Sequence, residues 1–201
     1  RVVVLDNAGW QYEAELVEVG RRATAVLHHK QPAANEPRAQ LTLYQALLKR
    51  DNFEWVLQKG TEIGVTRFVP LLTARTVAQP PHKADRWQRI LTEAAEQSRR
   101  GRIPALAEPL RLEDAWPQAQ TADLALLPWE GAAGETLAGA LAGKRPSTLA
   151  LFIGPEGGWT EAEVADGRAG GILPVTLGPR ILRAETAAIV AAALVMHTLG
   201  E

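Results

Sequence analysis

Residues 152–160 read Phe152-Ile153-Gly154-Pro155-Glu156-Gly157-Gly158-Trp159-Thr160, a glycine-rich segment between a strand pattern and a helix start. The apolar run 149–153 predicts a buried strand. Thr160, with Glu163 three residues later, has the form of a capping box that opens a helix. The glycines therefore follow the carboxyl end of a strand, where open α/β sheets bind their ligands. The alternative is a tight turn without a ligand, because glycine-rich turns are common.

This glycine-rich segment differs from the familiar phosphate-binding loops. It has no lysine followed by serine or threonine, which a nucleoside triphosphate loop requires, and no G-x-G-x-x-G spacing. The missing spacing argues against a Rossmann-type methyltransferase. The ligand of this loop can therefore be a compound without phosphate groups.

A second restricted loop lies in residues 177–187, which read Leu-Gly-Pro-Arg-Ile-Leu-Arg-Ala-Glu-Thr-Ala. It also follows a strand pattern and leads into a helix that is expected from about Glu185. Gly178-Pro179 restricts the backbone, and Arg180 and Arg183 stand three residues apart. Two such loops in succession favour a shared pocket. The alternative is that both arginines are solvated and that Glu185 only complements the helix dipole.

Strand and helix patterns alternate around these two loops. Strands are expected at 41–44, 67–71, 124–127, 149–153 and 172–177. Helices are expected at 51–63, 84–100, 137–141, from 160 onward and at 185–198. Asp51 or Asn52 would cap the first helix and Gly64 would end it. This alternation predicts an α/β domain with a mostly parallel sheet flanked by helices.

The first thirty residues have the pattern of β-structure instead. Strands are expected at 2–5, 10–19 and 23–27, with a hairpin-type turn at 6–9. Because three strands rarely fold alone, we interpret residues 1–34 as a partial barrel whose beginning is absent, at a truncated or partly missing amino terminus. The polar segment 31–38, with two prolines, is interpreted as a linker. The α/β domain would then cover residues 39–201.

Composition restricts the classes of function. The chain has 201 residues, of which 46% are hydrophobic and 22% charged, as in ordinary globular proteins. It has no cysteine, which excludes disulfides and thiolate sites and is compatible with a reducing compartment such as the cytoplasm. No apolar run is long enough to span a membrane. A net charge of −1 means that any RNA contact must come from local patches.

Four segments together resemble the RsmE family of the SPOUT class of RNA methyltransferases. They are IGPEGGWTEAE at 153–163, LGPRILRAETA at 177–187, QKGTEIGV at 58–65 and EAAEQSRR at 93–100. The resemblance runs from about Leu41 to the carboxyl terminus. One departure is Ala184, where the family usually has threonine, and it puts a role for that hydroxyl in doubt.

The resemblance implies a fold and an activity that periodicity does not reveal. It implies a SPOUT-type parallel sheet with a carboxyl-terminal trefoil knot, preceded by a PUA-like barrel and acting as a homodimer. The implied reaction is transfer of a methyl group from S-adenosylmethionine to N3 of a uridine in the decoding region of 16S ribosomal RNA. The small ribosomal subunit is the implied context.

Residue roles follow from the family match together with the positions at strand ends. Arg183 is expected to stabilise a uracil oxyanion or to bind a phosphate, or alternatively to form a bracing salt bridge. Glu185 and Glu156 are candidate proton acceptors, although helix-start support for Glu185 and amide bonding within its own loop for Glu156 are the alternatives. The cofactor contacts are expected at Leu127, Ile153, Gly154, Pro155, Glu156, Gly157, Gly158, Leu177, Gly178, Arg180, Ile181 and Leu182.

Contacts outside the pocket are expected as well. Arg99, Arg100 and Arg102 end a predicted helix and would contact RNA phosphates, unless they only complement the helix dipole. His28-His29 lacks a third ligand, so no metal is expected there. Trp55 and Trp87 are expected in the core, and Trp159 is expected beside the glycine-rich loop.

The helix expected at 187–199 is apolar nearly all round, which favours burial against a partner subunit. Two other functions stay open at this point. One is a SPOUT methyltransferase of different specificity, for example for the ribose 2′-hydroxyl. The other is an RNA-binding assembly module without catalysis.

Overall fold

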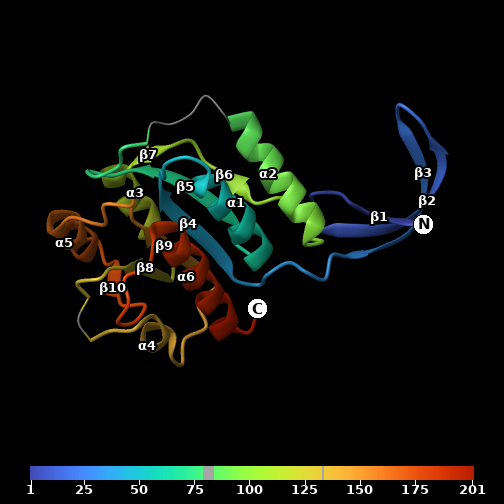
Figure 1. The fold of residues 1–201 in the computed structure, drawn as a ribbon. Helices are drawn as coiled ribbons and strands as arrows, with labels where there is room; N and C mark the ends of the chain where they lie inside the picture. The colour runs from blue at the N-terminus through green and yellow to red at the C-terminus, as the bar shows by residue number, and fades with distance from the viewer. Residues whose placement is uncertain (79–83, 133) are drawn as a thin grey trace.

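The computed structural model describes residues 1–78, 84–132 and 134–201, and it contains two sheets (Figure 1). The smaller, antiparallel sheet consists of β1 (Val2–Leu5), β2 (Trp10–Val19) and β3 (Ala23–Pro32). The larger sheet consists of β4 (Gln40–Ala46), β5 (Arg67–Leu72), β6 (Ala105–Leu106), β7 (Leu110–Arg111), β8 (Leu124–Pro128), β9 (Thr148–Ile153) and β10 (Leu173–Val175). The helices are α1 (Asn52–Ile63), α2 (Ala84–Gln97), α3 (Leu112–Ala119), α4 (Leu137–Leu141), α5 (Glu161–Ala169) and α6 (Ala184–Leu199).

The larger sheet is parallel, in the order β10-β8-β9-β4-β5-β6, with β7 beside β5. Alternation along β4 sends Leu41 and Leu43 to a core shared with α1, α2, α4 and α6. Tyr44 points to the opposite core with α3, where its ring stacks on Phe152 at 4.4 Å. Both faces are therefore covered, as a parallel sheet requires. All of its strands also place their carboxyl ends along one edge.

Several predicted elements are confirmed together with the local signals that mark them. α1 ends at Gly64, whose φ of 115° lets its N–H reach the carbonyls of Gly60 and Thr61. The capping box is formed, because Thr160 and Glu163 exchange hydrogen bonds at the start of α5. Asp51 precedes α1, but its side chain makes no capping hydrogen bond.

The segment 105–119 contains β6, β7 and α3, none of which the sequence analysis predicts. Two-residue strands carry no usable period, and Pro117 lies inside α3, where proline argues against a helix. α2 is also shorter than predicted, because Arg99 adopts a left-handed φ of 58° and its N–H turns back to the Glu96 carbonyl. Among the described helices, none is long and apolar enough to cross a membrane.

The amino-terminal segment forms a small three-stranded antiparallel sheet in the order β1-β2-β3. β3 continues to Pro32, into the segment interpreted as a linker. The turn at 6–9 is tied to the loop after α2, since Gly9 N donates to Gly101 O (3.0 Å) and Ile103 N to Asn7 Oδ1 (2.7 Å). Hydrogen bonds therefore join the small sheet to the α/β domain.

Arg100 corrects one of the predicted RNA contacts. Its side chain is buried and donates to Val65 O (2.6 Å) and Thr61 O (3.1 Å), and it pairs with Glu36 (3.1 Å). The other oxygen of Glu36 accepts from Arg102 N (2.9 Å). Because these contacts enclose its guanidinium, Arg100 joins the 33–38 segment to the end of α1 and does not face RNA. A sequence pattern of charges cannot distinguish a buried arginine from its exposed neighbours.

Replacing Arg100 with methionine is expected to lower the free energy of unfolding by about 3 kcal/mol, because Glu36 and two carbonyls lose their buried partner. Arg99→Met is the control: Arg99 is exposed, and a change there is expected within about 0.5 kcal/mol of the parent. Urea denaturation followed by circular dichroism measures both. Equal midpoints for the two variants would contradict this role.

Candidate functional site

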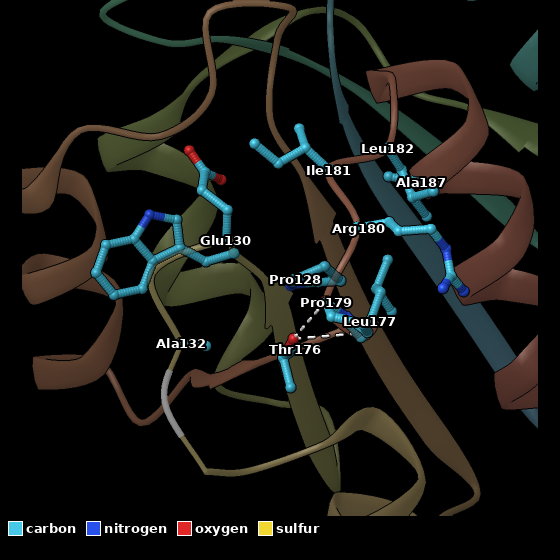
Figure 2. A pocket seen from close by; sticks show the side chains of 12 residues that line it. Pro128, Glu130, Ala132, Thr176, Leu177, Pro179, Arg180, Ile181, Leu182 and Ala187 are labelled. Atoms are coloured by element: carbon cyan, nitrogen blue, oxygen red, sulfur yellow. Dashed lines mark hydrogen bonds between the residues drawn. The ribbon is translucent and has the colours of Figure 1, made fainter.

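Two adjoining hollows lie at the carboxyl edge of the larger sheet, where the loops after β8, β9 and β10 meet. The first hollow, of about 510 Å³, is shown in Figure 2 and is lined by Pro128, Trp129, Glu130, Ala132, Thr176, Leu177, Gly178, Pro179, Arg180, Ile181, Leu182 and Ala187. The second hollow, of about 420 Å³, is lined by Asn52, Pro128, Glu130, Ile153, Gly154, Pro155, Glu156, Gly157, Gly158, Trp159, Ile181, Leu182, Arg183, Ala184, Glu185 and Ala187. Five residues line both, so the two hollows form one continuous site.

Trp159 holds the glycine-rich loop in place. This side chain is buried, and its indole N–H donates to the carbonyl of Pro128 (3.2 Å), which joins the loops after β8 and β9. A Cβ on Gly154 would lie 3.1 Å from the indole ring, a tight contact that would require the ring to shift slightly. Trp159 therefore holds the walls of the second hollow and is not exposed for base stacking.

Glu156 has a different partner from the expected one. Its Oε1 accepts from the backbone N–H of Lys49 (2.8 Å), in the loop between β4 and α1, and not from an amide of its own loop. The residue is exposed at the second hollow. The carboxylate thereby connects the β4–α1 loop to the β9–α5 loop.

The loop after β10 is shaped by Thr176 and Gly178. The hydroxyl of Thr176 accepts from Gly178 N (3.1 Å) and donates to Gly178 O (3.2 Å), as the dashed lines in Figure 2 show. Gly178 has a φ of 112°, a backbone conformation that residues other than glycine rarely adopt. Beyond this turn Ile181 is 87% exposed and stands where the two hollows meet.

The three predicted catalytic residues all line the second hollow. Arg183 is exposed and immediately precedes α6, and its side chain makes no capping hydrogen bond. Glu185 lies in the first turn of α6 and is buried to 7% exposure. With Glu156 on the facing loop, one guanidinium and two carboxylates surround the same space. That arrangement can stabilise a developing negative charge and accept a proton.

The structure corrects two further predictions. Leu127 is fully buried on the opposite core and lines neither hollow, whereas its neighbour Pro128 lines both. The two residues alternate along β8, so only one of them faces the site. Trp55 is 50% exposed and not part of the core, while Trp87 is buried as predicted.

The sequence analysis missed Glu130 and Asn52, which enter the site from the β8–α4 loop and the start of α1. Neither stands in a restricted motif, and only the neighbouring tryptophan at 129 gave a local signal. Glu130 lies against Gly158: a Cβ on that glycine would be 3.1 Å from its Oε1. A carboxylate is therefore present at the junction of the hollows.

Arg99 and Arg102 lie away from the hollows. Both are exposed in the loop that leads into the amino end of β6, at the opposite edge of the sheet. The guanidinium of Arg102 lies against the turn of the small sheet, 2.9 Å from where a Cβ on Gly9 would be. Arg102 thus lies beside the amino-terminal sheet.

The amino-acid sequence of this chain is similar to those of known RNA methyltransferases. Residues 34–196 match a family model described as an RNA methyltransferase domain. The ribosomal RNA small subunit methyltransferase E of Synechocystis is 40% identical over 194 residues, covering 95% of this chain and 64% of that protein's length. The protein of the same name from Bacillus subtilis is 32% identical over 208 residues. The alignment covers 98% of this chain and 81% of the length of the Bacillus protein.

Solved structures give the same result. The ribosomal RNA small subunit methyltransferase E from Neisseria gonorrhoeae, bound to S-adenosyl methionine, matches with a TM-score of 0.88 at 30% identity. The alignment covers 98% of this chain and 82% of that one. A methyltransferase from Legionella pneumophila with the same cofactor matches with a TM-score of 0.86 at 29% identity, over 97% of this chain and 81% of that one. Sequence and structure together show that this chain belongs to the ribosomal RNA small subunit methyltransferase E family.

Proposed function

We propose that the chain transfers a methyl group from S-adenosylmethionine to N3 of a uridine in the decoding region of 16S ribosomal RNA. The observation that carries this proposal is the convergence of three restricted loops on two joined hollows at the carboxyl edge of a parallel sheet. The names of the relatives support the ribosomal RNA target, and the Neisseria structure supports the methyl donor.

The residues of the hollows fit this donor. Each volume lies within the range of about 300–1,000 Å³ that small-molecule sites occupy. The glycines of the 154–158 loop let its backbone pass close to Trp159, Arg75 and Glu130, and this course forms one wall of the second hollow. Leu177 and Leu182 would offer an apolar wall for a purine, and the Glu130 carboxylate would be available to accept hydrogen bonds from hydroxyl groups of the donor. The cofactor set is then the predicted residues without Leu127, extended by Pro128 and Glu130.

The chemistry requires removal of the proton from uracil N3, because N3–H between two carbonyls is a poor nucleophile. Bound S-adenosylmethionine supplies a methyl group that its sulfonium has already activated. Arg183 stabilises the negative charge that develops on a uracil oxygen. Glu185, Glu156 or water accepts the proton, and the two carboxylates face the same hollow as Arg183. Holding N3 in line with the methyl group contributes most, of the order of 7–11 kcal/mol.

RNA is also expected to contact exposed arginines outside the two hollows. Arg99 and Arg102 form an exposed pair beside the small sheet, and their charges suit phosphate oxygens. We therefore propose that the RNA contact lies near the junction of the two sheets and does not include Arg100. The small ribosomal subunit is the proposed substrate, and the cytoplasm is accordingly the proposed location.

The test combines binding with product mapping. Isothermal titration with S-adenosylmethionine is expected to give one site per chain, and incubation with undermethylated small subunits is expected to yield 3-methyluridine in the 16S decoding region. Methylation of a ribose 2′-hydroxyl would instead establish a different specificity. A folded protein that retains RNA but binds no donor would favour an assembly module.

We also propose a trefoil knot, a PUA-like origin for the small sheet, and a homodimer formed through α6. After β10, at the end of the sheet, the chain returns to pack α6 against α4, β9 and α1, as a knotted course requires (Figure 1). The outer side of α6 carries the partly exposed apolar residues Ile189, Val190, Ala193 and Leu194 at helical spacing. A second copy covering this stripe would remove it from water.

Leu194→Asp is expected to weaken the dimer at least about 30-fold, because it places a carboxylate in the centre of an apolar interface. Leu194 is 42% exposed in the single chain. Sedimentation velocity over a concentration series measures the dissociation constant. Val17→Asp is the control, since Val17 is 63% exposed on the small sheet and is expected to change nothing. An unaltered dimer in the Leu194 variant would place the interface elsewhere.

A further inference from the structure

The outer side of the glycine-rich loop carries a contact that the hollow itself does not explain. Arg75, in the loop after β5, donates from Nη1 to the carbonyls of Gly157 (2.7 Å) and Trp159 (3.3 Å). These carbonyls flank Gly158, whose φ is 70°. One guanidinium therefore holds both ends of the turn that presents Gly157 and Gly158 to the second hollow.

Arg75 projects from a short turn that is itself ordered. Thr73 N donates to the Thr76 hydroxyl (2.9 Å), and Thr76 N donates to the Thr73 carbonyl (3.1 Å). Ala74 N donates to Oε1 of Glu163 (2.8 Å), the residue that also caps α5. The hydrogen bond from Ala74 to Glu163 thus joins the 73–76 turn to the start of α5, next to Arg75.

The stem of Arg75 supports the loop by packing as well. A Cβ on Gly157 would lie 3.2 Å from Cβ and 3.3 Å from Cδ of Arg75, so the bare glycine backbone rests directly on this side chain. In the part of the chain that the structure describes, Arg75 lines neither hollow. Any effect of Arg75 on a ligand in the second hollow therefore passes through the loop.

We propose that Arg75 is a positioning residue for S-adenosylmethionine, which holds the backbone of residues 157–159 in its binding shape. This inference rests on the proposed function. Trp159, Glu156 and Glu163 anchor the loop independently, so the fold is expected to survive removal of the guanidinium. The loop then gains conformational freedom that it must lose again on binding, and affinity falls.

The experiment titrates S-adenosylmethionine into the full chain and into three variants. Arg75→Met is expected to raise the dissociation constant about tenfold, the scale of a hydrogen bond to a charged group. Arg75→Lys keeps a charged donor without the planar group, and an increase of about threefold is expected. Arg145→Met is the matched control, because Arg145 is exposed and donates to the carbonyl of its neighbour Lys144. Melting temperatures of all variants are expected to agree within about 2 °C.

The outcomes separate this inference from the proposed function. If the parent chain binds no donor, the proposed function fails. If the parent binds and Arg75→Met binds equally well, the positioning role is overturned. It is also overturned if Arg75→Lys is as weak as Arg75→Met, because a charged donor should rescue part of the contact. A loss of RNA affinity alone, with donor affinity unchanged, would make Arg75 an RNA contact and would equally overturn the proposal.

Discussion

Gly178→Val is expected to raise the dissociation constant for S-adenosylmethionine at least about 100-fold while the protein stays folded. At a φ of 112°, a β-branched side chain is strained by about 3 kcal/mol, which corresponds to roughly that factor. Among the residues that the structure describes, and apart from Gly178 and its two chain neighbours, no heavy atom lies within 4 Å of where a Cβ on Gly178 would be, so the effect comes from the backbone and not from a clash. The loop is expected to relax to an allowed φ, which breaks the turn with Thr176 and moves the wall of the first hollow.

Gly171→Val provides the control for this prediction. Gly171 also has a left-handed φ (81°) and free space around the Cβ position, but it precedes β10, at the edge opposite the hollows. Both variants therefore carry comparable strain, and only Gly178→Val should lose the ligand. Isothermal titration on both, with circular dichroism to establish folding, makes the comparison. Equal affinities in the two variants would show that this loop does not shape the site.

Structural features that depend on a few adjacent residues could be predicted from the sequence. The capping box at Thr160 and the glycine that ends α1 are local hydrogen-bond patterns, and both are present in the structure. The parallel sheet followed from the alternation of strand and helix patterns, because each crossover helix returns the chain to the same edge. That rule predicts that the 154–158 and 177–182 loops meet at one edge of the sheet. The structure places them in adjoining hollows.

Features that depend on distant contacts could not be predicted. Arg99, Arg100 and Arg102 look alike in sequence, yet only Arg100 reaches Val65 and Glu36, residues 35 and 64 positions away. Arg75 likewise has no motif of its own, because its partners lie 82 and 84 positions later. Such roles depend on which loops the fold brings together, and periodicity carries no information about that.

The prediction for Leu127 was wrong because the sequence did not show which residue of β8 faces the site. The prediction placed Leu127 in the pocket because it ends an apolar strand run, but the site begins one residue later, at Pro128. A shift of one residue along a strand exchanges the two faces of the sheet. α3 could have been found from the buried spacing of Leu112, Ala115, Trp116 and Ala119, had Pro117 not argued against a helix.

Arg183→Met is expected to lower the rate of methyl transfer about 100-fold, with the affinity for S-adenosylmethionine changed less than about threefold. Loss of one group that stabilises a developing oxyanion typically lowers kcat about 100- to 1,000-fold. The side chain is well placed to act on substrate, since it forms no ion pair with any residue that the structure describes. The start of α6 uses only its backbone, because the Arg183 carbonyl accepts from Ala187 N (2.8 Å). Removing the guanidinium should therefore leave the helix and the donor pocket intact.

Arg180→Met is the comparison variant, because Arg180 is exposed on the same loop but lines the first hollow and not the second. As a proposed donor contact, Arg180 is expected to affect the affinity for S-adenosylmethionine, but not the single-turnover rate at saturating donor. Single-turnover transfer to small ribosomal subunits, with donor binding measured in parallel, separates chemistry from affinity. Arg183→Lys is expected to recover part of the rate, since it keeps the charge but not the planar donor. If Arg183→Met instead weakens RNA binding in a salt-dependent way and leaves the single-turnover rate unchanged, the guanidinium contacts phosphate and another group must stabilise the uracil. Comparable losses in the Arg180 and Arg183 variants would mean that the charge of the loop, and not the position of Arg183 between Glu156 and Glu185, is what the reaction uses.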